Sequence, residues 1–224
     1  RQGFTSKDGW MICFDHVYIT IANISGYQTD PAYEAEQGDN IKVKEKVALA
    51  QNYTIDLAEG DENAEPILVG EVKEAPVGHY NAISWEMVKA DEGPAKGYSL
   101  VIIGQAEKDG QKIDFTIGNN KEYRFTGGEF IGDERKGFLD ENGTTDLEMT
   151  FHFDHIFGDA ESPATDELNV GALGFAPFAQ RAQNGTVKVV SLENDLWPAD
   201  YNKMLEILPT LGHVGEGHCY HQEI

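Results

Sequence analysis

Two short segments contain five of the seven histidines of this chain. The segment FHFDHIFGD at 151–159 places His152 and His155 on either side of Asp154, and the segment GHVGEGHCYHQEI at 212–224 contains the other three. Imidazole is the commonest metal ligand in proteins, and pairs of histidines a few residues apart are typical of metal sites. The spacing therefore predicts that the two segments face each other around a metal ion.

The first histidine pair depends on where a strand ends. Alternation along TDLEMTFHFDHIF places Phe151 and Phe153 on the apolar face and His152 on the opposite face, and His155 breaks this alternation. If the strand ends near Phe153 and the chain turns, His152 and His155 converge on one point. If the strand continues, they point apart, and the sequence alone leaves both outcomes open.

The C-terminal segment adds histidines in a glycine-rich bend, where the backbone can wrap closely around an ion. We expect Asp154 or Glu216 to hold the second ring nitrogen of a ligand, and His221 to be accessory or unused. The alternative is a polar tail whose histidines face water. The four predicted ligands of one zinc or copper ion, with iron a poorer third choice, are His152, His155, His213 and His218.

The two cysteines, Cys13 and Cys219, lie near opposite ends of the chain. A disulfide between them would tie the tail to the first strand and hold His218 in place, so we predict this bridge and an oxidising compartment. The alternative role for Cys219 is that of a thiolate metal ligand.

Composition excludes some classes of partner. The 224 residues include 39 acidic and 17 basic side chains, which gives a net charge of -22. Such a charge repels phosphate backbones and anionic membrane surfaces, so we expect no nucleic-acid partner. No apolar run approaches the roughly 18 to 20 residues of a membrane-spanning helix. Because the chain begins at Arg1 rather than methionine, we expect that an upstream segment has been removed.

Strand patterns dominate the first two thirds of the chain. Trp10 to Ile24 is rich in β-branched and aromatic residues, and Asp109-Gly110 is typical of a tight hairpin. Helical spacing follows Pro198. We predict a mainly β chain, with an antiparallel β-sandwich of about eight or nine strands at 1–157. A short helical C-terminal cap with the metal-binding tail at 158–224 is expected to pack with it as one unit.

No catalytic motif stands out: the chain lacks a G-x-S-x-G elbow, an H-E-x-x-H helix, a P-loop and a dinucleotide fingerprint. Four protein ligands leave no open position for water, which predicts a non-catalytic binding protein. One alternative is a cell-surface carbohydrate- or protein-binding module that uses Tyr27 and Tyr33, with structural histidines. Another is a hydrolase or redox enzyme with three protein ligands on its metal.

The chain also resembles a family of uncharacterised bacterial proteins that are exported or lipid-anchored. The motifs that carry the resemblance are Asp8-Gly9-Trp10, Asp56-Leu57, Gly78-His79-Tyr80, His152 to Phe157, and Gly212 to Cys219. More distantly, the strand pattern is similar to periplasmic copper-binding proteins found beside methanobactin genes, although the Trp-x-His arrangement of some of those is missing here.

This resemblance implies a periplasmic or extracellular metal-binding protein, lipid-anchored through a removed N-terminal segment. It also implies a metal-transport partner in the periplasm or outer membrane.

Overall fold

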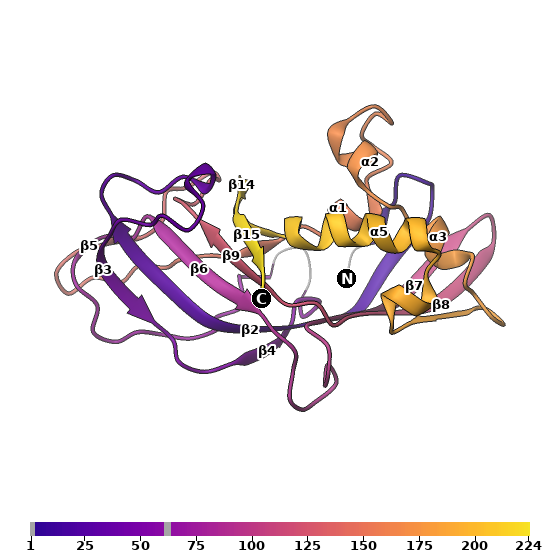
Figure 1. Cartoon of the computed structure of the whole chain (residues 1–224), viewed down its shortest axis with the longest axis horizontal. Helices are drawn as coiled ribbons and strands as arrows, with labels where there is room; N and C mark the ends of the chain where they lie inside the picture. Colours follow the sequence, from indigo (N-terminus) through magenta and orange to yellow (C-terminus); the bar gives the residue numbers. More distant parts are fainter. Residues whose placement is uncertain (1–2, 61–63) are drawn as a thin grey trace.

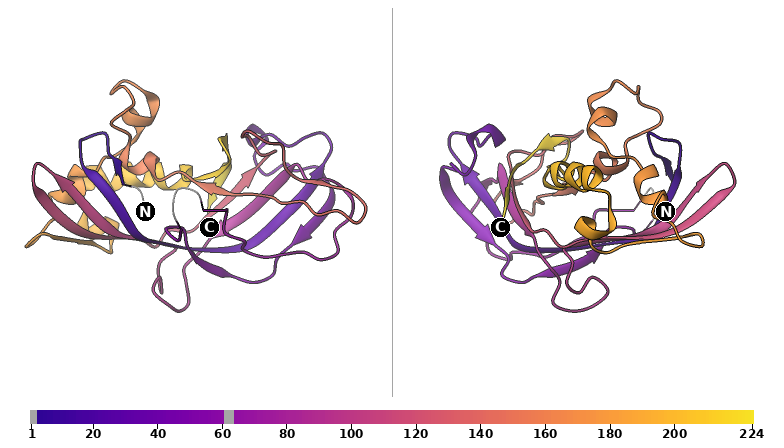
Figure 2. Two further views of the ribbon diagram at one scale, coloured as in Figure 1. Left: turned by 180° about the vertical axis from the view of Figure 1, so that it is seen from behind. Right: turned by 45° about the vertical axis from the view of Figure 1, so that its right-hand side comes forward.

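The computed structural model describes residues 3–60 and 64–224, and within them the chain is mainly β. One large mixed sheet curves around a group of short helices that come from the C-terminal third of the chain (Figures 1 and 2). The prediction of a mainly β chain with helices toward the C-terminus is confirmed.

The large sheet has ten strands, of which seven follow the order β12-β8-β7-β2-β6-β9-β15 and three more pair with β2. Its strands are β1 (Phe4–Thr5), β2 (Met11–Thr29), β3 (Val43–Ala48), β4 (Tyr53–Asp56), β6 (Ala82–Met87), β7 (Leu100–Lys108), β8 (Gln111–Asn119), β9 (Tyr123–Gly127), β12 (Thr186–Val189) and β15 (Tyr220–Glu223). The two small sheets consist of β11 (Thr150–Phe151), β13 (Gly212–Val214) and β14 (Gly217–His218), and of β5 (Gly78–His79) and β10 (Phe138–Leu139).

The helical segments are all short. They are η1 (Ala35–Gln37), α1 (Asp154–Phe157), α2 (Glu167–Gly171), α3 (Ala176–Ala179), α4 (Leu192–Asp195), α5 (Pro198–Ile207) and η2 (Leu208–Thr210). The longest, α5, has 10 residues, about half the length that a bilayer requires, so no described helix could span a membrane.

Strand β2 is the central strand of the large sheet, because it pairs with five others. It pairs with β7 and then β6, and also with β1, β4 and β3. Register shifts at Phe14/His16 and Ala22/Ser25 interrupt its ladders. Such bulges bend a strand and increase its twist, which accounts for the curved sheet seen in Figure 2.

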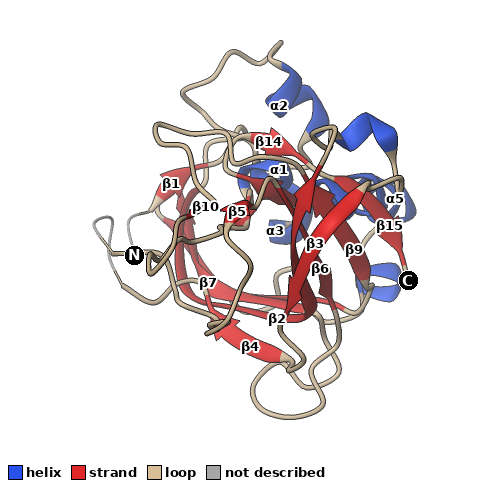
Figure 3. Cartoon of the chain, turned by 90° about the vertical axis from the view of Figure 1, so that its left-hand side faces the viewer, coloured by secondary structure: helices blue, strands red, loops and turns tan. Residues whose placement is uncertain are grey.

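The length of β2 explains why the structure differs from the predicted sandwich. Because one 19-residue strand carries ladders to five others, the strands join into one large sheet instead of two facing sheets. Strand β12 runs parallel to β8, so the sheet is mixed rather than antiparallel. Helices and the small β11-β13-β14 sheet cover its concave side, as the end-on view in Figure 3 shows.

Aromatic side chains fill the space between this layer and the large sheet. Phe157 and Phe178 are fully buried, and the Phe175 ring lies 5.1 Å from that of Phe115 on β8 and 5.3 Å from that of Trp10. Burial of one such ring contributes about 1.5–3 kcal/mol. The helical layer is therefore held by the same core as the strands.

Two local predictions are confirmed. Asp109 and Gly110 join β7 to β8 with φ values of 51° and 80°, which are the positive angles that a two-residue hairpin loop requires. Helix α5 begins at Pro198, where a proline needs no backbone N–H partner.

The predicted 158–224 unit also contributes strands to the large sheet. The two outermost strands of its main order, β12 and β15, both come from this unit.

Candidate metal centre

The three-stranded sheet aligns three histidines on one of its faces. His213 of β13 lies opposite Thr150 of β11 on one side and opposite His218 of β14 on the other. His152 continues the β11 ladder, because its N–H donates to the carbonyl oxygen of Leu211 at 2.9 Å. Since side chains alternate along strands, His152 is a diagonal neighbour of His213 on the same face.

The opposite face of this small sheet packs on the core. A Cβ at Gly212 would lie 2.5 Å from Cδ1 of Phe125, so the strand approaches the large sheet as closely as glycine allows. Val214 is also buried on this side. Packing of Gly212 and Val214 therefore determines which way His213 points.

The chain turns directly after β11, which resolves the alternative left open by the sequence. Strand β11 ends at Phe151, and the single-turn helix α1 brings His155 back so that its N–H donates to the carbonyl oxygen of His152 at 3.3 Å. Ile156 and Phe157 anchor α1 because both are fully buried. His152 and His155 therefore converge.

Three imidazoles meet at this point. One nitrogen from each of His152, His155 and His213 lies within 4.8 Å of the others, and such a group could hold a metal ion. The rings of His152 and His213 stack with centroids 4.1 Å apart, and the His155 ring stands across His213 at 5.0 Å. The His218 ring lies 4.8 Å from that of His213 but is exposed and stands outside this group of three.

Burial favours the neutral forms of His155 and His213. His213 is 3% exposed, and its burial, with the neighbouring His152 and His155, lowers its pKa to about 4. Burial also holds the pKa of His155 below its ordinary value. Nδ1 of His213 is buried and has no hydrogen-bond partner among the described residues. A buried polar atom left unpaired costs about 1–3 kcal/mol, and a metal ion would remove that cost.

Thr210 of η2, which no sequence pattern indicated, holds the second ring nitrogen of His155. Its hydroxyl lies 2.9 Å from Nδ1 of His155 and donates its only proton to the carbonyl oxygen of Ile207 at 2.8 Å. The hydroxyl oxygen must therefore accept from Nδ1–H, which leaves Nε2 of neutral His155 with a free lone pair. The expected partners of this nitrogen were Asp154 or Glu216, and for His155 that expectation is wrong.

Both cysteines are free thiols, so the predicted Cys13–Cys219 disulfide is wrong. The Sγ of Cys219 would lie 3.0 Å from a Cβ at Gly127. The register from β9 through β6 places Gly127 level with Gly26, near the far end of β2. The stretch of β2 from Cys13 to Gly26 spans roughly 40 Å along the strand. A disulfide requires Cα atoms about 4.4–6.8 Å apart.

Cys219 is not part of the group of three donors. Burial raises the pKa of its thiol to about 12, which favours the protonated form. His221 lies on β15, where it is exposed and pairs with Phe125 of β9 in the large sheet. The donor atoms that the structure brings together at this centre are therefore imidazole nitrogens.

The aromatic residues proposed to contact a carbohydrate or protein are not in exposed loops. Tyr27 belongs to β2 and is 8% exposed, and Tyr33 is 2% exposed with its hydroxyl donating to the carbonyl oxygen of Gly38. The expectation that these rings are available for binding is wrong. Strand β2 continues five residues beyond Ile24 and includes Tyr27, and Tyr33 is buried in the segment that follows it.

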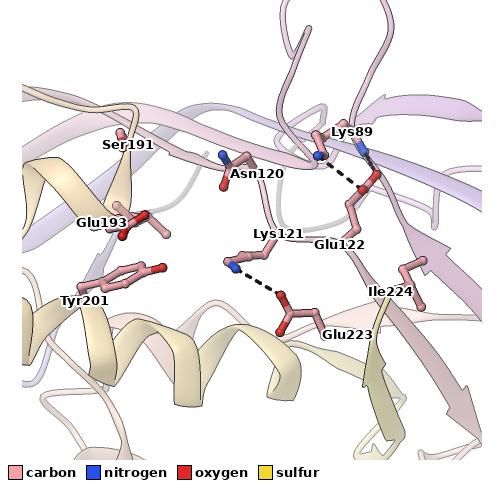
Figure 4. A pocket seen from close by; sticks show the side chains of 10 residues that line it. Lys89, Asn120, Lys121, Glu122, Ser191, Glu193, Tyr201, Glu223 and Ile224 are labelled. Carbon is pink, nitrogen blue, oxygen red and sulfur yellow. Dashed lines mark hydrogen bonds and ion pairs between the residues drawn. The ribbon is translucent and has the colours of Figure 1, made fainter.

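A separate polar pocket of about 310 Å³ lies between the β8–β9 turn, α5 and β15 (Figure 4). Its lysines are already paired with carboxylates: Nζ of Lys121 lies 3.2 Å from Glu223, and Nζ of Lys89 lies 3.5 Å from Glu122. Tyr201 also lines it, and none of the lining residues is a histidine. The pocket therefore offers no metal-ligand set comparable to the histidine cluster.

Comparisons of this chain with protein-family models, with curated proteins and with solved structures found no match. The resemblance to exported bacterial proteins therefore stays a prediction, and the functional conclusion rests on the histidine cluster.

Proposed function

We propose that this chain is an exported protein that binds one zinc or copper ion and serves metal acquisition, storage or delivery rather than catalysis. The observation that carries the proposal is the convergence of His152, His155 and His213 from two distant segments. His218 is the fourth proposed ligand, since its ring adjoins that of His213.

The dimensions of the cluster suit one ion. Zinc binds histidine nitrogen at about 2.0–2.1 Å, so two nitrogens on one tetrahedral ion are separated by about 3.4 Å. The three nitrogens lie no more than 4.8 Å apart, so small rotations of the side chains bring them into range. Nδ1 of His213 has no hydrogen-bond partner among the described residues, and the bond from His155 to the Thr210 hydroxyl uses Nδ1 rather than Nε2.

The donor set favours borderline metals. Imidazole suits zinc and copper, and the order of divalent affinities places copper above zinc at a given site. Export, a lipid anchor upstream of Arg1 and a metal-transport partner in the periplasm or outer membrane belong to the same proposal. These features are supported by the sequence resemblance alone.

Elemental analysis tests the metal site. We expect wild-type protein, loaded with zinc and dialysed, to retain one metal ion per chain, and a His213→Ala, His218→Ala double variant to retain none. A His221→Ala variant is the matched control, because His221 is exposed on β15 outside the cluster, and it should behave as wild type. Equal metal content in the wild type and the double variant would contradict the proposal.

A further inference from the structure

His218 differs from the other three histidines in its exposure and its support. His152 and His155 are half-buried and His213 is buried, whereas His218 is exposed. The inner three form the compact group, and the His218 ring touches it only through His213, at 4.8 Å and a tilt of 54°. Solvent therefore reaches the cluster on the His218 side.

The strand that carries His218, β14, is an edge strand, and the residues on both sides of it are hydrogen-bonded to other segments. Strand β14 has two residues, and β13 is its sole partner in the three-stranded sheet. On one side, the N–H of Glu216 donates to the carbonyl oxygen of Ile131 at 2.8 Å. On the other side, Tyr220 begins β15 in the large sheet. His218 thus lies on a short edge strand, and its side chain can move without disturbing the core.

The backbone that carries His155 and His213 has no such freedom. Gly212, next to His213, packs against Phe125, and buried Ile156 and Phe157 anchor α1, which contains His155. Thr210 also fixes the His155 ring. An ion bound by the cluster would therefore be held by three imidazoles close to the core and by one peripheral imidazole.

We propose, on the basis of the metal site proposed above, that His218 is the exchangeable ligand through which the ion enters and leaves. When a donor atom of water, a chelator or an acceptor protein forms its bond to the ion, the bond from His218 breaks first. His152, His155 and His213 keep the ion until the incoming donors replace them. No redox change is involved, because each step exchanges one electron-pair donor for another and the ion keeps its oxidation state.

Release of Co²⁺ to a chelator tests this assignment. Protein loaded with one Co²⁺ is mixed with excess EDTA, and the loss of the cobalt absorption is followed by stopped flow. We expect His218→Ala and His218→Gln to bind one Co²⁺ and to release it at least about tenfold faster than wild type, because loss of a direct ligand costs no less than the roughly 10-fold that loss of an outer-shell partner costs. Added free imidazole should slow the release from His218→Ala, because it fills the vacated position.

Two controls separate this inference from the metal site itself. His152→Ala should lose tight Co²⁺ binding, and His221→Ala should release Co²⁺ at the wild-type rate. Release from both His218 variants at the wild-type rate, or complete loss of Co²⁺ from both, would overturn the assignment of His218 while leaving the metal site intact. Failure of the wild type to bind any Co²⁺ would instead contradict the proposed function.

Discussion

At the residue scale, the centre depends on one hydroxyl that sequence patterns did not indicate. Thr210 has a single proton to donate, and the carbonyl oxygen of Ile207 accepts it. The same oxygen then accepts from Nδ1–H of His155, which selects the tautomer whose Nε2 is free for a metal. Thr210 is therefore a positioning residue that acts through His155.

Replacement of Thr210 tests this role. Thr210→Val keeps the side-chain shape but removes the acceptor, so we expect metal affinity to fall by about 10- to 100-fold, measured by competition with a chromophoric chelator. Thr210→Ser keeps the hydroxyl and should restore the affinity. Long-range ¹⁵N NMR of His155 should show the Nδ1–H tautomer in the wild type and in Thr210→Ser. Equal affinities of the two variants would contradict the positioning role.

At the element scale, the β13–β14 turn sets where His218 lies. Gly215 has φ +61°, and a Cβ there would lie 2.0 Å from the carbonyl oxygen of Ile131. Thr150 holds the same turn, because its hydroxyl donates to the carbonyl oxygen of Gly215 at 3.0 Å. The turn is therefore clamped from two neighbouring segments, and only glycine fits.

Gly215→Ala should displace this turn. We expect the free energy of unfolding in urea to fall by about 1–3 kcal/mol more than in Gly97→Ala, and Co²⁺ release to accelerate because His218 moves with the turn. Gly97 is the matched control: it has φ +83°, but no atom lies within 4 Å of a Cβ built there. Equal destabilisation by the two substitutions would show that the contact with Ile131 is unimportant.

At the scale of the whole molecule, the histidine cluster links folding to pH. His213 titrates near 6.5 in an unfolded chain, but its pKa is about 4 in the folded protein, chiefly because of burial. Between these values the unfolded chain binds the extra proton. The free energy of unfolding therefore falls as pH falls through this window, by about 1.4 kcal/mol per pH unit for one group. Above the window, the group is neutral in both states and contributes no pH dependence.

A His213→Asn variant isolates this effect. In metal-free buffer with EDTA, we expect the difference in unfolding free energy between wild type and variant to change in favour of the variant by about 2 kcal/mol from about pH 7 to about pH 5. The comparison cancels the contribution of the many carboxylates, which both proteins share. A difference that stays constant across this range would contradict the depressed pKa of His213.

Local chemistry alone determined much of this protein. The histidines were predicted as ligands from their types and spacing, Asp109-Gly110 as a hairpin from its tolerance of positive φ, and the start of α5 from Pro198. These features depend on neighbours a few residues away, so a single sequence contains the information.

Tertiary packing decided the rest. Whether the chain turns after Phe151, and which way His213 points, follows from how buried Phe157 and Gly212 fit against a sheet built by other segments. The same packing separates Cys13 from Cys219 along β2, buries Tyr27 and brings Thr210 to His155. Each of these outcomes is a contact between distant parts of the chain, and its energy depends on close fit between surfaces that no local pattern encodes.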